Sequence, residues 1–166
     1  MSPAFFRRRF RWKGDVVVVD LPEDEQEMLA HVLPQLRELV MGETDPALRR
    51  LSPPARPDDE EAETFYRQMV TDDLLRSRLE AIEIVEEGIG GTTLDDAGID
   101  AWMHSLNALR LVLGERLDVD VVGHDALHDL ADDDERVPIV ALYEWLGWLL
   151  EQLVEAAMNG LPDGED

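Results

Sequence analysis

Two histidines four residues apart, His124 and His128, have the spacing in this chain that comes nearest to a metal site. Each is followed by an aspartate, Asp125 and Asp129, and a helical turn would direct both imidazoles at one divalent ion. The sequence identifies no third ligand and no metal-binding motif before the pair. We therefore interpret both as histidines of an exposed loop and predict neither a metal site nor a cofactor.

Other patterns that could support catalysis lack specificity. The chain has 38 acidic residues, so the presence of two carboxylates does not identify a general acid and base. The glycines of Gly88-Ile-Gly-Gly91 are not followed by the Gly-Lys-Ser/Thr ending of a phosphate-binding loop. They indicate the end of a helix, and we predict no catalytic residues.

The apolar stretch from Trp102 to Val119 carries three polar side chains: Asn107, Arg110 and Arg116. At 100° per residue, its apolar residues occupy two neighbouring faces of one helix, which predicts a central position in a helical domain. Polar groups beside a core are usually paired with each other or with loop carbonyls. We expect an internal polar network, and the alternative is a ligand pocket lined by Asn107 and Arg110.

The N-terminal segment is basic, while the chain as a whole is acidic. Five of the 15 basic residues, and none of the acidic ones, lie in the first 13 positions. They fit either an edge strand whose cations face the acidic body or an arm that docks on a partner. Near the other end of the chain, Trp148 is a candidate contact residue, unless a neighbouring element covers it. The candidate partner-binding residues are Arg7, Arg8, Arg9, Arg11 and Trp148.

The elements that must position these residues are mostly helical. The pattern predicts one domain over residues 1–166: a β-hairpin over 5–20, a helical body over 22–158 and a disordered tail over 159–166. Lys13-Gly14-Asp15 marks the hairpin turn, and Asp20 and Asp95 are candidate helix caps. The fold class is therefore mainly α, a bundle of about five helices with a small N-terminal hairpin. The expected helices cover residues 22–41, 60–70, 73–87, 95–117 and 138–158.

Composition narrows the class of protein further. The net charge of −23 repels phosphate backbones, so direct binding of nucleic acid is not expected. The chain has no cysteine, which excludes disulfides and cysteine nucleophiles. We expect no export signal and no membrane-spanning stretch. These features predict a cytoplasmic protein.

Several motifs resemble a known family. The stretch from Leu106 to Leu117, with Asn107, Arg110 and Gly114, resembles the signature helix of small acidic actinobacterial proteins classified as a domain of unknown function. Further similarity lies in Asp45-Pro46, Asp58-Asp59, Tyr66-Arg67 and Tyr143-Glu-Trp145-Leu-Gly147, so the resemblance covers most of residues 5–155. Some members of that family are described as AosR-type oxidative-stress transcriptional regulators.

The resemblance implies a regulatory role exerted through protein contacts. Because the chain has no cysteine, it cannot use a cysteine-based redox switch. Oxidation of its six methionines is the remaining way to sense an oxidant. The sequence thus favours a non-enzymatic regulatory protein that binds a protein partner, such as a transcription component. The alternative is a small-molecule or metal-binding enzyme that uses the polar stripe around Asn107 and Arg110.

Overall fold

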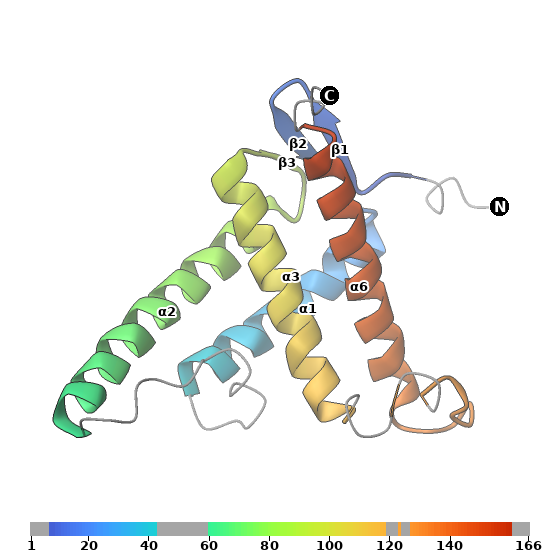
Figure 1. Cartoon of the computed structure of the whole chain (residues 1–166). Helices are drawn as coiled ribbons and strands as arrows, with labels where there is room; N and C mark the ends of the chain where they lie inside the picture. The colour runs from blue at the N-terminus through green and yellow to red at the C-terminus, as the bar shows by residue number, and fades with distance from the viewer. Residues whose placement is uncertain (1–6, 43–59, 119–122, 124–126, 161–166) are drawn as a thin grey trace, which may run out of the picture.

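The computed structural model describes residues 7–42, 60–118, 123 and 127–160 (Figure 1). The start of the predicted hairpin at residues 5 and 6, the family-like residues at 45–59 and most of the predicted tail lie outside this part of the chain. The described elements are β1 (Phe10–Lys13), β2 (Val16–Val19), α1 (Glu23–Gly42), α2 (Glu60–Gly88), β3 (Thr92–Leu94), α3 (Asp96–Arg116) and α6 (Val137–Met158). The predicted fold class, mainly α with an N-terminal hairpin, is confirmed.

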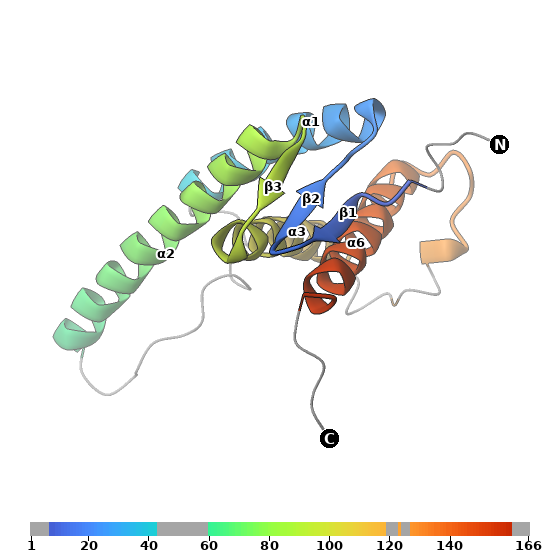
Figure 2. The ribbon, with the colours of Figure 1, turned by 90° about the horizontal axis from the view of Figure 1, so that it is seen from above.

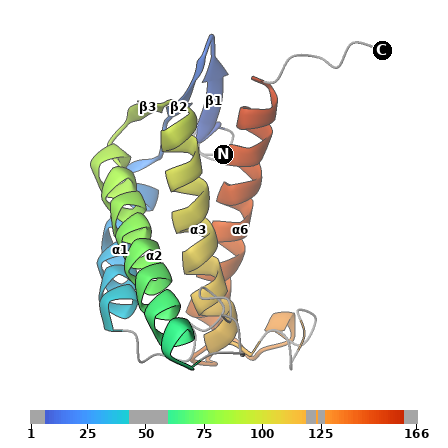
Figure 3. The same ribbon diagram turned by 60° about the vertical axis from the view of Figure 1, so that its left-hand side comes forward.

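A small antiparallel sheet lies across one end of the helices (Figures 1 and 3). Strands β1 and β2 form the predicted hairpin, with Lys13 opposite Val16, and Gly14 makes the turn with φ of +74°, a conformation that favours glycine. Strand β3 pairs with the other edge of β2, so the strand order is β1-β2-β3. Strand β1 is therefore an edge strand.

The structure differs from the predicted elements at two places after residue 59. The helices expected over 60–70 and 73–87 form one continuous helix, α2, because Thr71, Asp72 and Asp73 lower helix propensity only slightly and no proline or glycine interrupts the segment. Strand β3 was not predicted, since three residues after the turn at Gly91 give too short a pattern to recognise.

Helix α1 also begins differently from the prediction. Asp20 does not cap it. The first backbone bond runs from Gln26 N to Pro22 O at 3.0 Å, and the Asp20 carboxylate binds Arg7 instead. The helix continues through Pro34 to Gly42, and Arg37 of α1 links to Glu86 of α2, with Nη1 3.3 Å from Oε2.

Helix α3 is central, as the sequence predicted, and lies between α2 and α6 (Figure 2). Its N-terminus is capped by Asp95, whose side chain accepts a hydrogen bond of 2.8 Å from Gly98 N. Trp102 of α3 is fully buried, and its ring meets that of Phe10 edge to face with centroids 5.7 Å apart. This contact joins the sheet to the helical core.

Helix α6 is the one helix in the described residues that is long and apolar enough to cross a membrane by length and composition. Length and composition alone do not test the expectation that the chain has no membrane-spanning stretch. The core helix of a soluble protein meets the same test, and in this fold Leu146, Leu149 and Leu153 of α6 are fully buried. Helix α6 packs against α3 and β1.

Replacement of Trp102 by alanine is expected to lower the free energy of unfolding by about 3–5 kcal/mol, because it empties a fully buried site. Urea denaturation followed by circular dichroism measures the change. The matched control is Phe65→Ala on α2, where the aromatic side chain is 67% exposed and the expected change is within about 0.5 kcal/mol. Equal losses in the two variants would contradict the assignment of Trp102 to the core.

Candidate functional site

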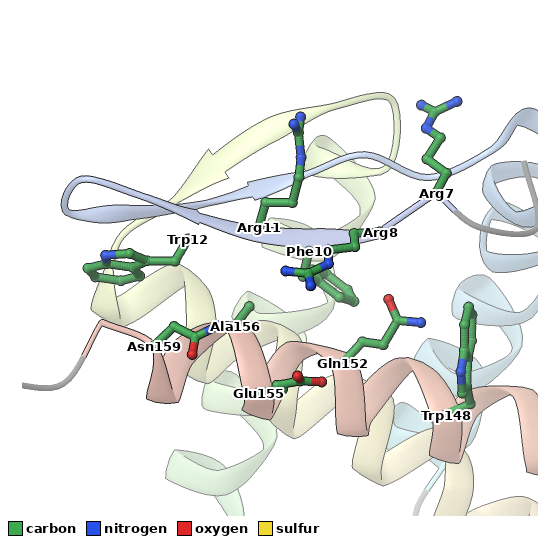
Figure 4. Close-up of a pocket in the computed structure, with 10 residues that line it drawn as sticks. All are labelled: Arg7, Arg8, Phe10, Arg11, Trp12, Trp148, Gln152, Glu155, Ala156 and Asn159. Atoms are coloured by element: carbon green, nitrogen blue, oxygen red, sulfur yellow. The ribbon is translucent and has the colours of Figure 1, made fainter. Parts of the chain in front are cut away.

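A groove of about 560 Å³ runs between β1 and α6 (Figure 4). One wall comes from the N-terminal segment and β1, and the other from the C-terminal half of α6. The groove gathers four of the five predicted partner-binding residues from the two ends of the chain. Its lining residues are Arg7, Arg8, Phe10, Arg11, Trp12, Trp148, Gln152, Glu155, Ala156 and Asn159.

The fifth predicted contact residue, Arg9, lies beneath the groove and not at its surface. Its side chain is 7% exposed, and its Nε donates to Oε2 of Glu25 on α1 at 2.9 Å. The same carboxylate accepts a hydrogen bond of 2.5 Å from Trp145 Nε1 on α6. Glu25, also 7% exposed, is thus shared by two elements. Arg9 is an internal ion-pair residue, and its guanidinium is not available for docking.

Arg9 also organises its surroundings through other atoms. Its guanidinium carbon lies 4.8 Å from the ring centroid of Trp148, a distance typical of a cation–π contact. Its backbone N–H donates to Oε1 of Gln152 at 3.2 Å, and its guanidinium donates to the carbonyl oxygen of Arg7. The segment before β1 is therefore held against α1 and α6 at once.

The remaining arginines are exposed around the groove. Figure 4 shows Arg8 extending from the start of β1 toward α6, whereas Arg7 and Arg11 extend from the side of β1 turned away from α6. Arg7 binds the carboxylate of Asp20, with Nε 2.8 Å from Oδ2. That hydrogen bond is the main reason that the pKa of Asp20 lies below its ordinary value, and the charges of Arg11 and Arg9 add to the effect.

Trp148 was considered either an exposed contact residue or a ring covered by a neighbouring element, and it is partly both. Its side chain is 38% exposed, yet one part of it meets Arg9. The ring is therefore held in place by the protein and still accessible from the groove. Ordered aromatic rings of this kind contribute strongly to protein interfaces, because little side-chain entropy is lost on binding.

The opposite end of the groove is closed by Trp12. A Cβ atom at Gly160, two residues after the end of α6, would lie only 2.3 Å from Cη2 of Trp12, so this position must be glycine for the ring to keep its place. Asn159 lines the groove beside it. Nothing in the sequence distinguishes Trp12 or Gly160 as a site residue, since neither belongs to a recognisable motif.

The three residues of the predicted polar network on α3 lie in different surroundings. Asn107 and Arg116 are exposed, so burial does not require an internal partner for either side chain. Arg110 lies inside, with its guanidinium carbon 5.1 Å from the ring centroid of Tyr143. A Cβ atom at Gly147 would lie 3.2 Å from Arg110 Nε, which explains a glycine within α6. Arg110 thus packs α3 against α6 and does not line the β1–α6 groove.

The histidine pair gives no metal centre in the described part of the chain. His124 and Asp125 lie outside it, and His128 Nε2 lies 3.0 Å from Oε1 of Glu144, with both side chains exposed. Among the residues that the structure places, no three metal-ligating side chains of His, Cys, Asp or Glu gather at one point. The chemistry of the groove is that of cations, aromatic rings and one carboxylate, Glu155.

Replacing Arg7 by alanine is expected to raise the pKa of Asp20 toward its ordinary value of 3.8, because the hydrogen bond from Arg7 is the main cause of the lowering. Because the pKa of Asp20 is lower in the folded state, the ion pair stabilises the protein at pH values above the ordinary pKa of an aspartate. This stabilisation is lost as the pH falls through the lowered pKa. Carbon-13 NMR titration of the aspartate carboxyl groups measures the shift.

The control for this titration is Asp134, whose pKa of about 2 results from hydrogen bonds to Arg136. It is expected to stay unchanged in Arg7→Ala. An Asp20 pKa that is the same with and without Arg7 would show that the N-terminal segment is not anchored as described.

Comparison with known proteins places the chain in a family. No curated protein and no solved structure matches it. A family model described as "Domain of unknown function (DUF2017)" matches residues 7–157, a range that includes β1, all of α6 except its last residue, and every lining residue of the groove except Asn159. The chain belongs to the DUF2017 family.

Proposed function

We propose that this protein is a non-enzymatic regulatory protein that binds a partner protein through the β1–α6 groove. The observation that carries the proposal is the gathering of Arg7, Arg8, Arg11 and Trp148 around one groove from opposite ends of the chain. Residues that are far apart in sequence and rich in arginine and tryptophan are typical of the centres of protein interfaces.

The charge distribution indicates what kind of segment the groove accepts. The chain as a whole carries a net charge of −23, whereas Arg8 and Arg11 are exposed at the groove. A short acidic segment can bind these cations, while an extended polyanion such as DNA is repelled by the rest of the surface. The proposed partner is therefore a protein with a local acidic segment and a less acidic body.

The setting of this interaction follows from the family resemblance in the sequence. The stretch around Asn107, Arg110 and Gly114 resembles AosR-type regulators, so we place the protein in the cytoplasm, in transcriptional regulation under oxidative stress. The partner is then a component of the transcription apparatus. Any redox response of the chain itself has to use methionine. Among the described residues, the exposed methionines that an oxidant can reach are Met28, Met41, Met69 and Met158.

The alternative of an enzyme built around Asn107 and Arg110 is not supported by their positions. Asn107 is exposed and Arg110 packs on Tyr143, so the two side chains do not converge on a shared groove. An active site requires polar groups that converge on one reacting position. The groove at β1 and α6 is the better candidate for function.

Affinity capture from cell lysate tests the proposal. The full chain is expected to retain a defined protein, and the combined change Arg8→Ala, Arg11→Ala and Trp148→Ala is expected to lose it, because three groove contacts are removed. Mass spectrometry identifies the retained proteins, and recovery of a transcription component supports the regulatory assignment.

The control variant changes Arg67, Arg76 and Phe65 to alanine, which removes two exposed arginines and one exposed aromatic residue from α2. It is expected to retain the same partner as the unchanged chain. A partner that is lost with the α2 variant and kept with the groove variant would move the interface away from β1 and α6.

A further inference from the structure

We propose that the bound segment is extended and adds to the edge of β1 as a fourth strand, between β1 and α6. The inference rests on the proposed function and specifies how the groove recognises its partner. Its occupant is a segment of another protein in which acidic and apolar residues alternate. Strand addition of this kind obtains affinity from main-chain hydrogen bonds and specificity from alternate side chains.

The main chain of β1 is oriented for such pairing. Asp20 N donates to Arg9 O at 2.8 Å, so the Arg9 carbonyl faces β2 just before the register in which Phe10 lies opposite Val19. Hydrogen-bonded and non-hydrogen-bonded pairs alternate along antiparallel strands. The N–H and C=O groups of Phe10 and Trp12 therefore point away from β2, toward the groove side of β1.

Helix α6 already supplies one substitute for a strand partner. Oε1 of Gln152 accepts the hydrogen bond of the Arg9 backbone N–H at 3.2 Å, immediately before Phe10. An amide carbonyl is the same group that the backbone of an added strand would offer. The side chain of Gln152 thus binds the main-chain donor just before β1. Phe10 and Trp12, the outward-facing positions of β1, are left for an incoming chain.

The side chains around the groove favour alternation in the bound segment. Arg7 and Arg11 extend on the face of β1 turned away from α6 (Figure 4), where acidic side chains of an added strand would meet them. On the other face, Trp12 and Trp148 line the groove together with Glu155, above the buried ring of Phe10. Aromatic rings attract apolar side chains there, and Glu155 disfavours acidic ones.

Two simpler explanations of this surface, protection of an edge strand and pairing with a second copy, leave some of its features unexplained. Charged side chains protect an exposed edge strand from aggregation, but protection requires no groove of about 560 Å³ with an ordered tryptophan beside it. A second copy of the chain could pair edge to edge through β1, but it would place its own Arg7, Arg8 and Arg11 against these arginines. Like charges across paired strands are destabilising, so a separate acidic partner fits better.

The test uses the full chain and the synthetic peptide acetyl-Val-Glu-Val-Glu-Val-Glu-Val-amide at neutral pH. NMR titration of the nitrogen-15-labelled protein measures binding, and hydrogen exchange at saturation measures protection of individual amides. The amides of Phe10 and Trp12 are expected to exchange at least about tenfold more slowly with the peptide bound. The amide of Arg11 already faces β2 and serves as the internal control.

Two sets of peptide controls separate main-chain pairing from charge attraction. In the first, alternate backbone nitrogens are methylated, once on the valines and once on the glutamates. One of these two peptides is expected to bind at least about tenfold more weakly, because it has lost the donors that face β1. In the second, lysine replaces glutamate, and binding is expected to disappear.

Several results would overturn strand addition. If the peptide binds but neither methylation weakens it and the Phe10 and Trp12 amides stay unprotected, the groove recognises charge without pairing. If the peptide does not bind, while capture of a cellular partner still depends on Arg8, Arg11 and Trp148, strand addition is wrong and the proposed function stands. If both the peptide and groove-dependent capture fail, the proposed function fails as well.

Discussion

The buried ion pair between Arg9 and Glu25 is the interaction on which the arrangement of the functional surface depends. Two charges that are each 7% exposed are tolerated inside a protein only when they are paired and their remaining hydrogen-bonding atoms are used. Glu25 meets this condition through Arg9 and Trp145, and Arg9 adds contacts to Gln152 and Trp148. The segment before β1 is consequently fixed against α1 and α6, and the groove has two defined walls.

This anchoring explains how a basic segment can serve two purposes in an acidic protein. Arg9 is directed inward and Arg7 is bound to Asp20, so these two residues hold the segment in place. Arg8 and Arg11 are exposed at the groove and are available to a partner. Neighbouring arginines therefore have different places in the structure: two anchor the segment and two are exposed, although all four are the same residue type in the sequence. Under the proposed function, an acidic surface around a small basic groove would restrict the partner to one with a short acidic segment.

The sequence predicts long periodic elements well and long-range pairing poorly. The positions of the hairpin turn at Gly14, the cap at Asp95 and the central helix α3 follow from local residue patterns. The continuity of α2 and the existence of β3 do not, because both depend on weak local preferences decided by tertiary contacts. The same limit applies to the site. Clustering of basic residues identifies the arginines. The burial of Arg9, in contrast, depends on Glu25, which lies 16 positions from Arg9 and 120 positions from its other partner, Trp145.

A double-mutant cycle on Arg9 and Glu25 tests the central claim most directly. Arg9→Met, Glu25→Gln and the double variant remove either charge or both, and Gln at position 25 can still accept from Trp145. Each single variant is expected to lose about 3–5 kcal/mol of unfolding free energy, because one buried charge is left unpaired. The double variant is expected to lose less than the sum, with a coupling of about 1–3 kcal/mol. Additive losses would show that the two side chains act independently and that the pair does not hold the groove together.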